Sequence, residues 1–392
     1  MAKFCKYAKR IGAEPVVITA KFEGGLQDET LIDDLPQDLE VHRVAWSVLG
    51  KRNLFSRLWR LVARAILPDP HGAWGRAAYR KAIELSRDRN FDAVLVSYGA
   101  PSALRSGVKV GKKLALPVIV DIRDFKQKNI INGRRLQSFG RIRQRLLNHL
   151  ENSIFSKALY ISTVSETYRE ILHSHYHIDY RNISVIYNGY DPEDFADKDT
   201  LAPTDQQILR YIGYINNFES LSNFANALGN INIKRGHLGK SPVLFEIIGA
   251  NESRIIRRIF EENGALEWYK VVGYVPHKEA VELACRAAGL VLMPTSEKGV
   301  VPGKFCEYLG AKRPILMLNN QNDELRRLIS ENRIGEIAEY DNVYEIEHGI
   351  EKVLDCQGYR KSFSEEMFRR DFQAMEFIRL VERAVFAYKE KK

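Results

Sequence analysis

The sequence predicts an α/β protein built from two Rossmann-like domains, and three observations support this fold class. The chain has 392 residues, 45% of them apolar, which is enough for about two domains of ~100–200 residues each. Strand-like runs alternate with helical patterns along both halves, as in parallel sheets with crossover helices. A stretch rich in Asn, Gly, Asp and Pro at 187–205 separates the halves.

The elements follow in the same order in each half. The first half contains the runs "PVVIT", "DAVLVSYG", "LPVIVDI", "ALYISTVS" and "SVIYNG". The second contains "ILRYIGYI", "VLFEIIGA", "YKVVGYV", "GLVLMP" and "RPILML". We therefore expect one domain at 1–190, a second at 191–362, and a final amphipathic helix at 363–392 that opens with a Ser362…Glu365 capping box.

Composition limits the class of protein. Four cysteines lie far apart with no C-x-x-C, which fits a reducing cytosol and offers no metal framework. No apolar run approaches the ~18–20 residues of a membrane span, and no signal-peptide core opens the chain, so we expect a cytoplasmic protein. The net charge of +9 is concentrated in 51–150, which holds 22 basic against 6 acidic residues. That region is suited to an anionic partner.

The stretch "VPGKFCEYLGAKRPIL" (301–316) predicts a loop, a helix and a strand. Gly303 lies just before the helix, where bare N–H groups and the helix dipole favour an anion. Lys304 and Glu307 share one face of the first turn. A cation there suits a phosphate and a carboxylate suits a pair of hydroxyls, which together suggest a nucleotide or nucleotide-sugar. An ordinary surface helix with a stray ion pair explains the same residues equally well.

In open α/β sheets ligands bind beyond the carboxyl ends of the strands. The loops after Gly213, Gly249, Val275 and Pro294 are therefore expected to converge on one wall of an interdomain cleft, beside the 304–307 helix.

The order of these motifs resembles glycosyltransferase family 4. The similarity rests on "ISTVSETYREIL…ISVIYNGYDPEDF", "LRYIGYI", "FEIIGA", "VVGYVPHKEAVELACRAAGLVLMPTSE" and "GKFCEYLGAKRPIL", and it covers nearly the whole chain. In the first half, "PDPHGAW", "VSYGAPSALRSG" and "PVIVDIRD" are similar to the branch that builds bacterial surface polysaccharides. The resemblance implies a GT-B fold, with two domains facing across a cleft and the C-terminal helix packing back toward the first.

The resemblance also implies a retaining, metal-independent enzyme that uses a nucleotide-diphosphate sugar and no cofactor. Glu307 would hold the donor ribose hydroxyls, and Lys304 with Gly303 would face the diphosphate. The remaining donor-binding candidates are Gly213, Gly249, Gly273, Val275 and Glu297. Asp121, Arg123 and Asp124 end a first-domain strand and are the catalytic candidates, Asp124 above all. Arg123 has the alternative of pairing with a neighbouring carboxylate. The acceptor region would include Ser97, Pro101 and Ser102.

Three departures from the family pattern stand out. Tyr214 and Glu219 occupy the positions of a usual Arg and Lys, so Lys304 would carry more of the phosphate-binding role. The usual spacing back from Glu307 reaches Gly299, and Glu297 becomes the partner glutamate only with a longer loop. The usual first strand and glycine-rich loop are lacking, which should leave two strand edges unpaired.

Two basic amphipathic stretches, 53–67 and 133–150, suit an anionic membrane surface such as one carrying lipid-linked acceptors. Ordinary helices with their apolar side in the core fit the same pattern. The "HSHYH" stretch at 173–177 lacks a familiar metal spacing, and Asp197-Lys198-Asp199 falls in the linker, so we expect no metal site.

The leading hypothesis is a cytoplasmic, peripherally membrane-bound glycosyltransferase acting on a glycan or lipid-linked glycan. One alternative is a nucleotide-sugar epimerase of the same fold, which would need neither an acceptor nor a basic first domain. Another is a catalytically silent partner subunit, which the missing first strand and absent Arg/Lys pair favour. A nucleic-acid binder is disfavoured because the basic region has no zinc-finger, helix-turn-helix or RNA-binding signature.

Overall fold

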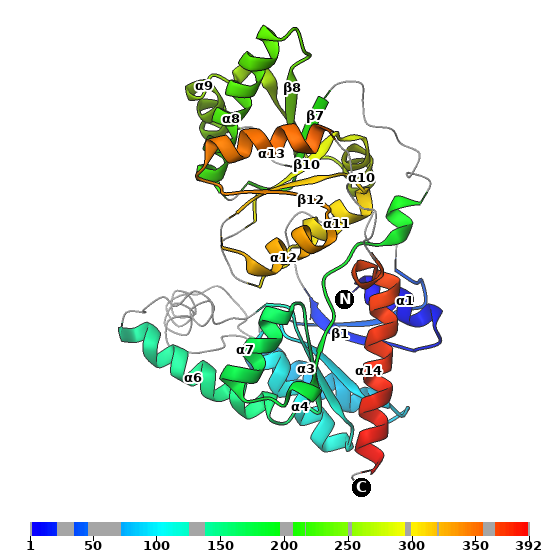
Figure 1. Ribbon diagram of the computed structural model, residues 1–392. Helices are drawn as coiled ribbons and strands as arrows, with labels where there is room; N and C mark the ends of the chain where they lie inside the picture. Colours follow the sequence, from blue (N-terminus) through cyan, green and yellow to red (C-terminus); the bar gives the residue numbers. More distant parts are fainter. Residues whose placement is uncertain are drawn as a thin grey trace, which may run out of the picture. The chain divides into compact units, whose positions relative to one another are not determined.

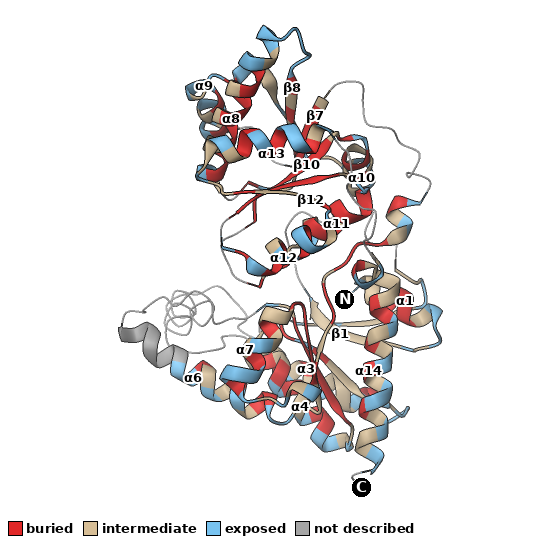
Figure 2. Cartoon of the chain, in the orientation of Figure 1, coloured by how far each residue is buried: buried red, intermediate tan, exposed pale blue. Residues whose placement is uncertain are grey.

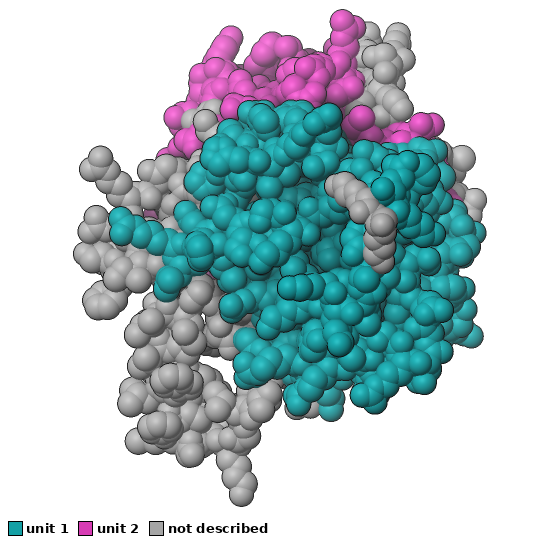
Figure 3. Space-filling model, turned by 90° about the horizontal axis from the view of Figure 1, so that it is seen from below, with its two compact units in different colours: residues 1–187, 373–392 teal, residues 188–372 magenta. Residues whose placement is uncertain are grey.

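The chain forms two compact units, as Figure 3 shows by colour. The computed structural model describes residues 2–21, 35–45, 72–124, 138–196, 207–215, 217–249, 253–294, 299–319, 321–355 and 365–390, and side chains of 138–144 are outside this description. Unit 1 comprises residues 1–187 and 373–392, and unit 2 comprises 188–372. Parallel strands alternate with helices in both, which confirms the predicted α/β class (Figure 1).

Unit 1 contains parallel strands in two separate sheets. Its strands are β1 (Val16–Lys21), β2 (Glu40–Ala45), β3 (Val94–Ser97), β4 (Val118–Ile122), β5 (Tyr160–Thr163) and β6 (Ile183–Val185). Its helices are α1 (Ala2–Arg10), α3 (Gly72–Leu85), α4 (Pro101–Leu114), α6 (Ser138–Phe155), α7 (Glu166–Tyr176) and most of α14 (Arg370–Glu390).

The division of the sheet falls between β1 and β3. β1 pairs with β2, and β3, β4, β5 and β6 pair in that order, while no described strand joins the two sets. Among the described strands, β1 and β3 each have an edge without a strand partner, which matches the two unpaired edges expected from the family pattern. Helices hold the sheets together, because α3 contacts β1 and β2, α4 contacts β3 and β4, and α3 packs against α4.

The C-terminal helix α14 covers the larger sheet of unit 1, as the predicted fold requires. Leu380 and Ala384 pack against Ile119 of β4, and the ring of Phe377 lies 5.1 Å from that of Phe4 in α1. The helix begins at Arg370 instead of near residue 363. Arg369 is extended and bridges Tyr190, since the N–H groups of Tyr190 and Arg370 donate to the carbonyls of Phe368 and Tyr190, both at 2.9 Å.

Unit 2 is a six-stranded parallel sheet in the order β12-β11-β10-β7-β8-β9. The strands are β7 (Gln207–Ile212), β8 (Val243–Ile248), β9 (Tyr269–Gly273), β10 (Gly289–Leu292), β11 (Ile315–Leu318) and β12 (Gly335–Ala338). The helices are α8 (Phe218–His237), α9 (Arg254–Glu262), α10 (His277–Arg286), α11 (Gly303–Ala311), α12 (Asp323–Asn332) and α13 (Val343–Asp355).

Apolar residues on both faces of the central strands fix this sheet. β10 and β11 are buried at every position, which is typical of parallel strands covered by helices on both sides (Figure 2). A continuous core joins these strands to α8, α9 and α13. Within the described ranges, no helix combines the length and apolarity that a bilayer span requires.

A buried carboxylate ties together three elements of unit 1. Glu151 of α6 is fully buried and accepts hydrogen bonds from the hydroxyls of Tyr98 and, at 2.7 Å, Tyr176 of α7. Burial, followed by the nearby Glu151 charge, raises the pKa of Tyr176, so its phenol remains a donor. The two phenol hydroxyls replace the hydrogen bonds to water that the Glu151 carboxylate loses on burial.

We predict that Tyr176→Phe lowers the free energy of unfolding by about 1–3 kcal/mol, because Glu151 loses a donor it cannot replace from solvent. Urea denaturation measures the change. The matched control is Tyr160→Phe, since the Tyr160 hydroxyl has no hydrogen bond to any described residue. Equal losses in the two variants would show that the Glu151 bond contributes nothing.

Candidate functional site

The strand order of unit 2 reverses between β7 and β10. The chain runs from β7 through β8 to β9 in one direction and from β10 through β11 to β12 in the other. Ligands of open α/β sheets bind outside the strand ends where the order reverses. Gly213 follows β7 at this point, and α11 is the helix that follows β10.

Glycines at the strand ends leave the backbone bare at this edge. Gly213 and Gly249 have φ of +115° and +92°, in the region that disfavours other residues. The Gly213 N–H donates to Ile248 and the Gly249 N–H to Gly273, both at 2.7 Å. A Cβ on Gly249 would lie 3.4 Å from the Cα of Gly213. Gly213, Gly249 and Gly273 therefore form a glycine surface at the strand ends that carries no side chain of its own.

Helix α11 is held firmly against this edge. Phe305, Cys306 and Leu309 are completely buried on its inner face. The buried Tyr308 hydroxyl accepts from the Ile212 N–H at 2.9 Å and donates to the Val291 carbonyl at 3.2 Å, which links α11 to β7 and β10. At its start no side chain caps α11, so the first N–H groups are available to a ligand.

Lys304 projects from the first turn of α11 onto the loop after β7. Its Nζ donates to the Tyr211 hydroxyl at 2.7 Å and lies 4.2 Å from the centre of the Tyr211 ring. A Cβ on Gly213 would lie 3.3 Å from the same nitrogen. Burial lowers the pKa of Lys304 to about 8, against the opposing effect of Glu307. An anion bound beside the amine would raise this pKa again.

Glu307 lies one turn further along α11 and is half-buried. Burial raises the pKa of its carboxyl, while His277, Arg370 and Lys304 lower it and Asp194 raises it. His277 lies 3.1 Å from Asp194, Nε2 to Oδ2. None of the hydrogen bonds among the described residues reaches the Glu307 carboxylate. Both oxygens are therefore available to accept from ligand hydroxyls.

The arrangement can bind an anion and a diol together. Lys304 and the bare amides at the start of α11 attract negative charge, and Glu307 accepts hydrogen bonds a helical turn away. The glycine surface lets a ligand approach the backbone closely.

The other donor-binding candidates vary in position. Gly303 is exposed at the start of α11. Val275 is half-buried in the loop between β9 and α10, after the exposed Tyr274. Glu297 lies outside the described residues. Tyr214 and Glu219, which replace two family cations, are both exposed, so among the described side chains Lys304 provides the cation against Gly213.

The first-domain candidates at the end of β4 differ in environment. Asp121 is fully buried and accepts from Arg123 at 2.9 Å and Ser162 at 3.0 Å. Arg123 also lies over the Phe377 ring, 5.5 Å from its centre. These bonds give Asp121 a structural role between β4 and β5, and they fit the alternative weighed for Arg123. Asp124 is exposed, without a hydrogen bond to a described residue.

The expected acceptor residues cluster around the end of β3. Ser97 is exposed and pairs in register with Asp121. Pro101 begins α4, and Ser102 follows it as a buried residue whose hydroxyl has no hydrogen-bond partner. Of the two proposed membrane stretches, 53–67 lies outside the described residues, while the later part of 133–150 belongs to α6.

Four further site residues escaped the sequence analysis. Tyr211 and Tyr308 resemble core residues of a strand and a helix, and their contacts with Lys304 and with the strand ends are visible only in the structure. His277 stands directly after the "GYVP" segment, a signal that was present in the sequence. Asp194 belongs to the short helix 192–195, and its contact with His277 spans a sequence separation that no local pattern reveals.

Known structures share this fold. A glycosyltransferase from Rickettsia africae ESF-5 aligns with a TM-score of 0.61 at 14% identity, covering 99% of this chain and 93% of that one. Anabaena HepE in complex with UDP aligns with a TM-score of 0.60 at 11% identity, covering 100% of this chain and 95% of that one. A UDP-GlcNAc 2-epimerase from Methanocaldococcus jannaschii aligns with a TM-score of 0.56 at 14% identity, covering 97% of this chain and 95% of that one. Such identities show the fold alone, and that fold is GT-B.

The sequence itself also matches a known family. No curated protein sequence matches the chain significantly. Residues 1–194 match the profile of Glycosyltransferase Family 4. The first half of the chain therefore matches glycosyltransferase family 4, and the chain has the GT-B fold.

Proposed function

We propose that this protein is a retaining, metal-independent glycosyltransferase that takes its sugar from a nucleotide-diphosphate donor. The observation that carries the proposal is the pairing of Lys304 and Glu307 on α11, at the point where the strand order of unit 2 reverses. HepE, with the same fold, is described in complex with UDP, which supports a nucleotide ligand for this unit.

In the proposed reaction Glu307 accepts hydrogen bonds from the ribose hydroxyls, and Lys304 faces the diphosphate. As the sugar leaves, negative charge grows on the departing diphosphate, and a fixed cation in a half-buried site stabilises that charge. Lys304 is already oriented by Tyr211 and needs little reorganisation. The acceptor hydroxyl attacks from the face that the diphosphate vacates, so positioning replaces a protein nucleophile.

The acceptor is proposed to be a glycan or lipid-linked glycan in surface polysaccharide synthesis. Asp124 is the candidate polar group from unit 1, since its exposed carboxylate has no hydrogen bond to a described residue. The basic balance of 51–150, 22 cations against 6 anions, supports peripheral contact with the cytoplasmic face of an anionic membrane through 53–67 and 133–150.

Two rival functions would use the same donor site, and the products formed from a nucleotide-sugar distinguish them. An epimerase of this fold would change a nucleotide-sugar without any acceptor, as the M. jannaschii protein's name implies of that enzyme. A silent partner subunit would bind the nucleotide without turnover. Chromatography of each nucleotide-sugar after incubation, with and without membrane extract, distinguishes all three.

Calorimetric titration of the full chain with UDP, GDP, ADP and dTDP tests the donor site. One diphosphate should bind selectively, and Glu307→Gln should weaken it by about tenfold or more, because hydrogen bonds to a charged group contribute roughly 1.5–3 kcal/mol. Glu351→Gln on exposed α13 makes the same chemical change away from the site and should leave affinity unchanged. Unaltered binding by Glu307→Gln removes the donor assignment.

Lys304 makes donor binding depend on pH. Because its pKa is lowered to about 8, the amine is charged below that value and neutral above it, so affinity for the diphosphate should fall as pH rises through about 8. Lys304→Arg retains its charge throughout and should flatten this dependence. Titrations on both sides of pH 8 decide the matter, and parallel profiles for the two proteins would contradict the role of Lys304.

A further inference from the structure

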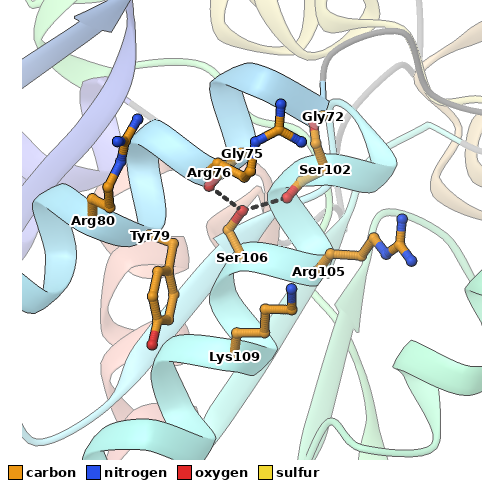
Figure 4. Close-up of a pocket in the computed structure, with 9 residues that line it drawn as sticks. All are labelled: Gly72, Gly75, Arg76, Tyr79, Arg80, Ser102, Arg105, Ser106 and Lys109. Atoms are coloured by element: carbon orange, nitrogen blue, oxygen red, sulfur yellow. Dashed lines mark hydrogen bonds between the residues drawn. The ribbon is translucent and has the colours of Figure 1, made fainter.

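A second, strongly basic cavity lies in unit 1 between α3 and α4 (Figure 4). Its volume is about 600 Å³, within the usual range of ligand sites. Arg76 and Arg80 line it from α3, and Arg105 and Lys109 line it from α4. No carboxylate is among its lining residues. None of these four cations figures in the donor site, which belongs to unit 2.

Helical geometry groups these charges in pairs around the cavity. Arg76 and Arg80 are four residues apart, as are Arg105 and Lys109, so each pair occupies one face of its helix. The two helices pack against each other. All four side chains are exposed, and none forms an ion pair with a residue in the described part of the chain. By contrast, Lys81 of α3 pairs with Glu84 at 2.6 Å.

Two buried serines provide a polar floor beneath the cations. The Ser106 hydroxyl shares its single proton between two backbone carbonyl oxygens, that of Gly75 at 2.8 Å and that of Ser102 at 2.6 Å. The Ser102 residue is 3% exposed, and its hydroxyl has no hydrogen-bond partner. A buried hydroxyl without a partner is unfavourable and rare in proteins. A ligand oxygen reaching the floor would satisfy it.

The close approach of the helices is built into the sequence. Gly75 lies where a Cβ would come within 2.9 Å of the Cβ and carbonyl oxygen of Ser102. Any larger residue would push α3 away from α4. The cavity is therefore defined by backbone contact at its base, with long cationic side chains around its opening.

We propose that the α3–α4 pocket binds a phosphate or diphosphate group of a ligand distinct from the donor nucleotide. Four like charges around one opening repel one another unless a multivalent anion compensates them. The guanidinium groups of three arginines match the paired oxygens of a phosphate, which a single carboxylate could not supply to all of them. The phosphate belongs either to a lipid or to a soluble phosphorylated molecule.

The test uses the full chain, with inorganic pyrophosphate as the probe. Calorimetric titration should detect binding, and the double variant Arg76→Gln/Arg105→Gln should weaken it by about tenfold or more. The matched control, Lys112→Gln/Lys113→Gln, removes the same charge from exposed positions of α4 outside the pocket and should change affinity by less than about twofold. Melting temperatures verify that each variant is folded.

Repeating the pyrophosphate titration in the Lys304→Gln variant distinguishes binding in this pocket from binding at the donor site. Pyrophosphate binding that survives Lys304→Gln and is lost on adding Arg76→Gln/Arg105→Gln supports the pocket, whatever becomes of the donor assignment. If the Lys304→Gln substitution abolishes pyrophosphate binding and the Arg76→Gln/Arg105→Gln substitutions do not change it, the pocket proposal is overturned. The absence of any pyrophosphate binding to the unaltered chain would overturn it as well.

Vesicle sedimentation identifies the source of the phosphate. Phosphatidylcholine vesicles containing phosphatidic acid present a lipid-borne phosphate. Sedimentation that depends on Arg76 and Arg105, but not on Lys112 and Lys113, would assign a lipid ligand. Pyrophosphate binding with no such dependence on vesicles would assign a soluble phosphorylated ligand.

Discussion

The proposed donor site depends on the close approach of the glycines that follow β7 and β8. With glycines at 213 and 249 the two strand ends pass close together, since a Cβ on Gly249 would lie 3.4 Å from the Cα of Gly213. The N–H of each glycine donates to a carbonyl of the neighbouring strand. A side chain at Gly213 would meet the amine of Lys304. The position of Lys304, and with it the site's charge, therefore follows from the absence of side chains on the adjoining loop.

The two ionisable groups of α11 are both shifted toward their neutral forms by the same burial. Lys304 has a lowered pKa and Glu307 a raised one, because partial removal from water disfavours either charge. A ligand that offers an anion to one group and hydroxyls to the other would stabilise both charged forms. Under the proposed function, a ligand that carries both parts is therefore favoured over one that carries either part alone. The buried Tyr308, which fixes α11 to two strands, keeps the groups in place.

Local patterns predicted what depends on local geometry. The strands, the α/β class and the position of Lys304 and Glu307 follow from apolar periodicity and from a strand–loop–helix order. Pairing of Arg123 with a neighbouring carboxylate was one of two expected alternatives, and the structure shows it with Asp121. The bond of Asp121 to Ser162 could not be predicted, because the sequence around a strand-end carboxylate is the same whether the group faces solvent or the next strand. The start of α14 was placed too early because a capping pattern does not reveal that Arg369 is extended by pairing with Tyr190.

The divided sheet of unit 1 has a consequence for the local opening of this unit. Among the described residues, β1 and β2 form a two-stranded ribbon whose hydrogen bonds reach no other strand, and such ribbons are marginal alone. In the described part of unit 1, this ribbon lies chiefly against α3. Amide protons of β1 and β2 will thus exchange with solvent through local opening well before those of β4, whose residues are wholly buried between two paired neighbours. Unit 1 contains two regions of unequal stability, and the basic pocket on α3 adjoins the weaker one.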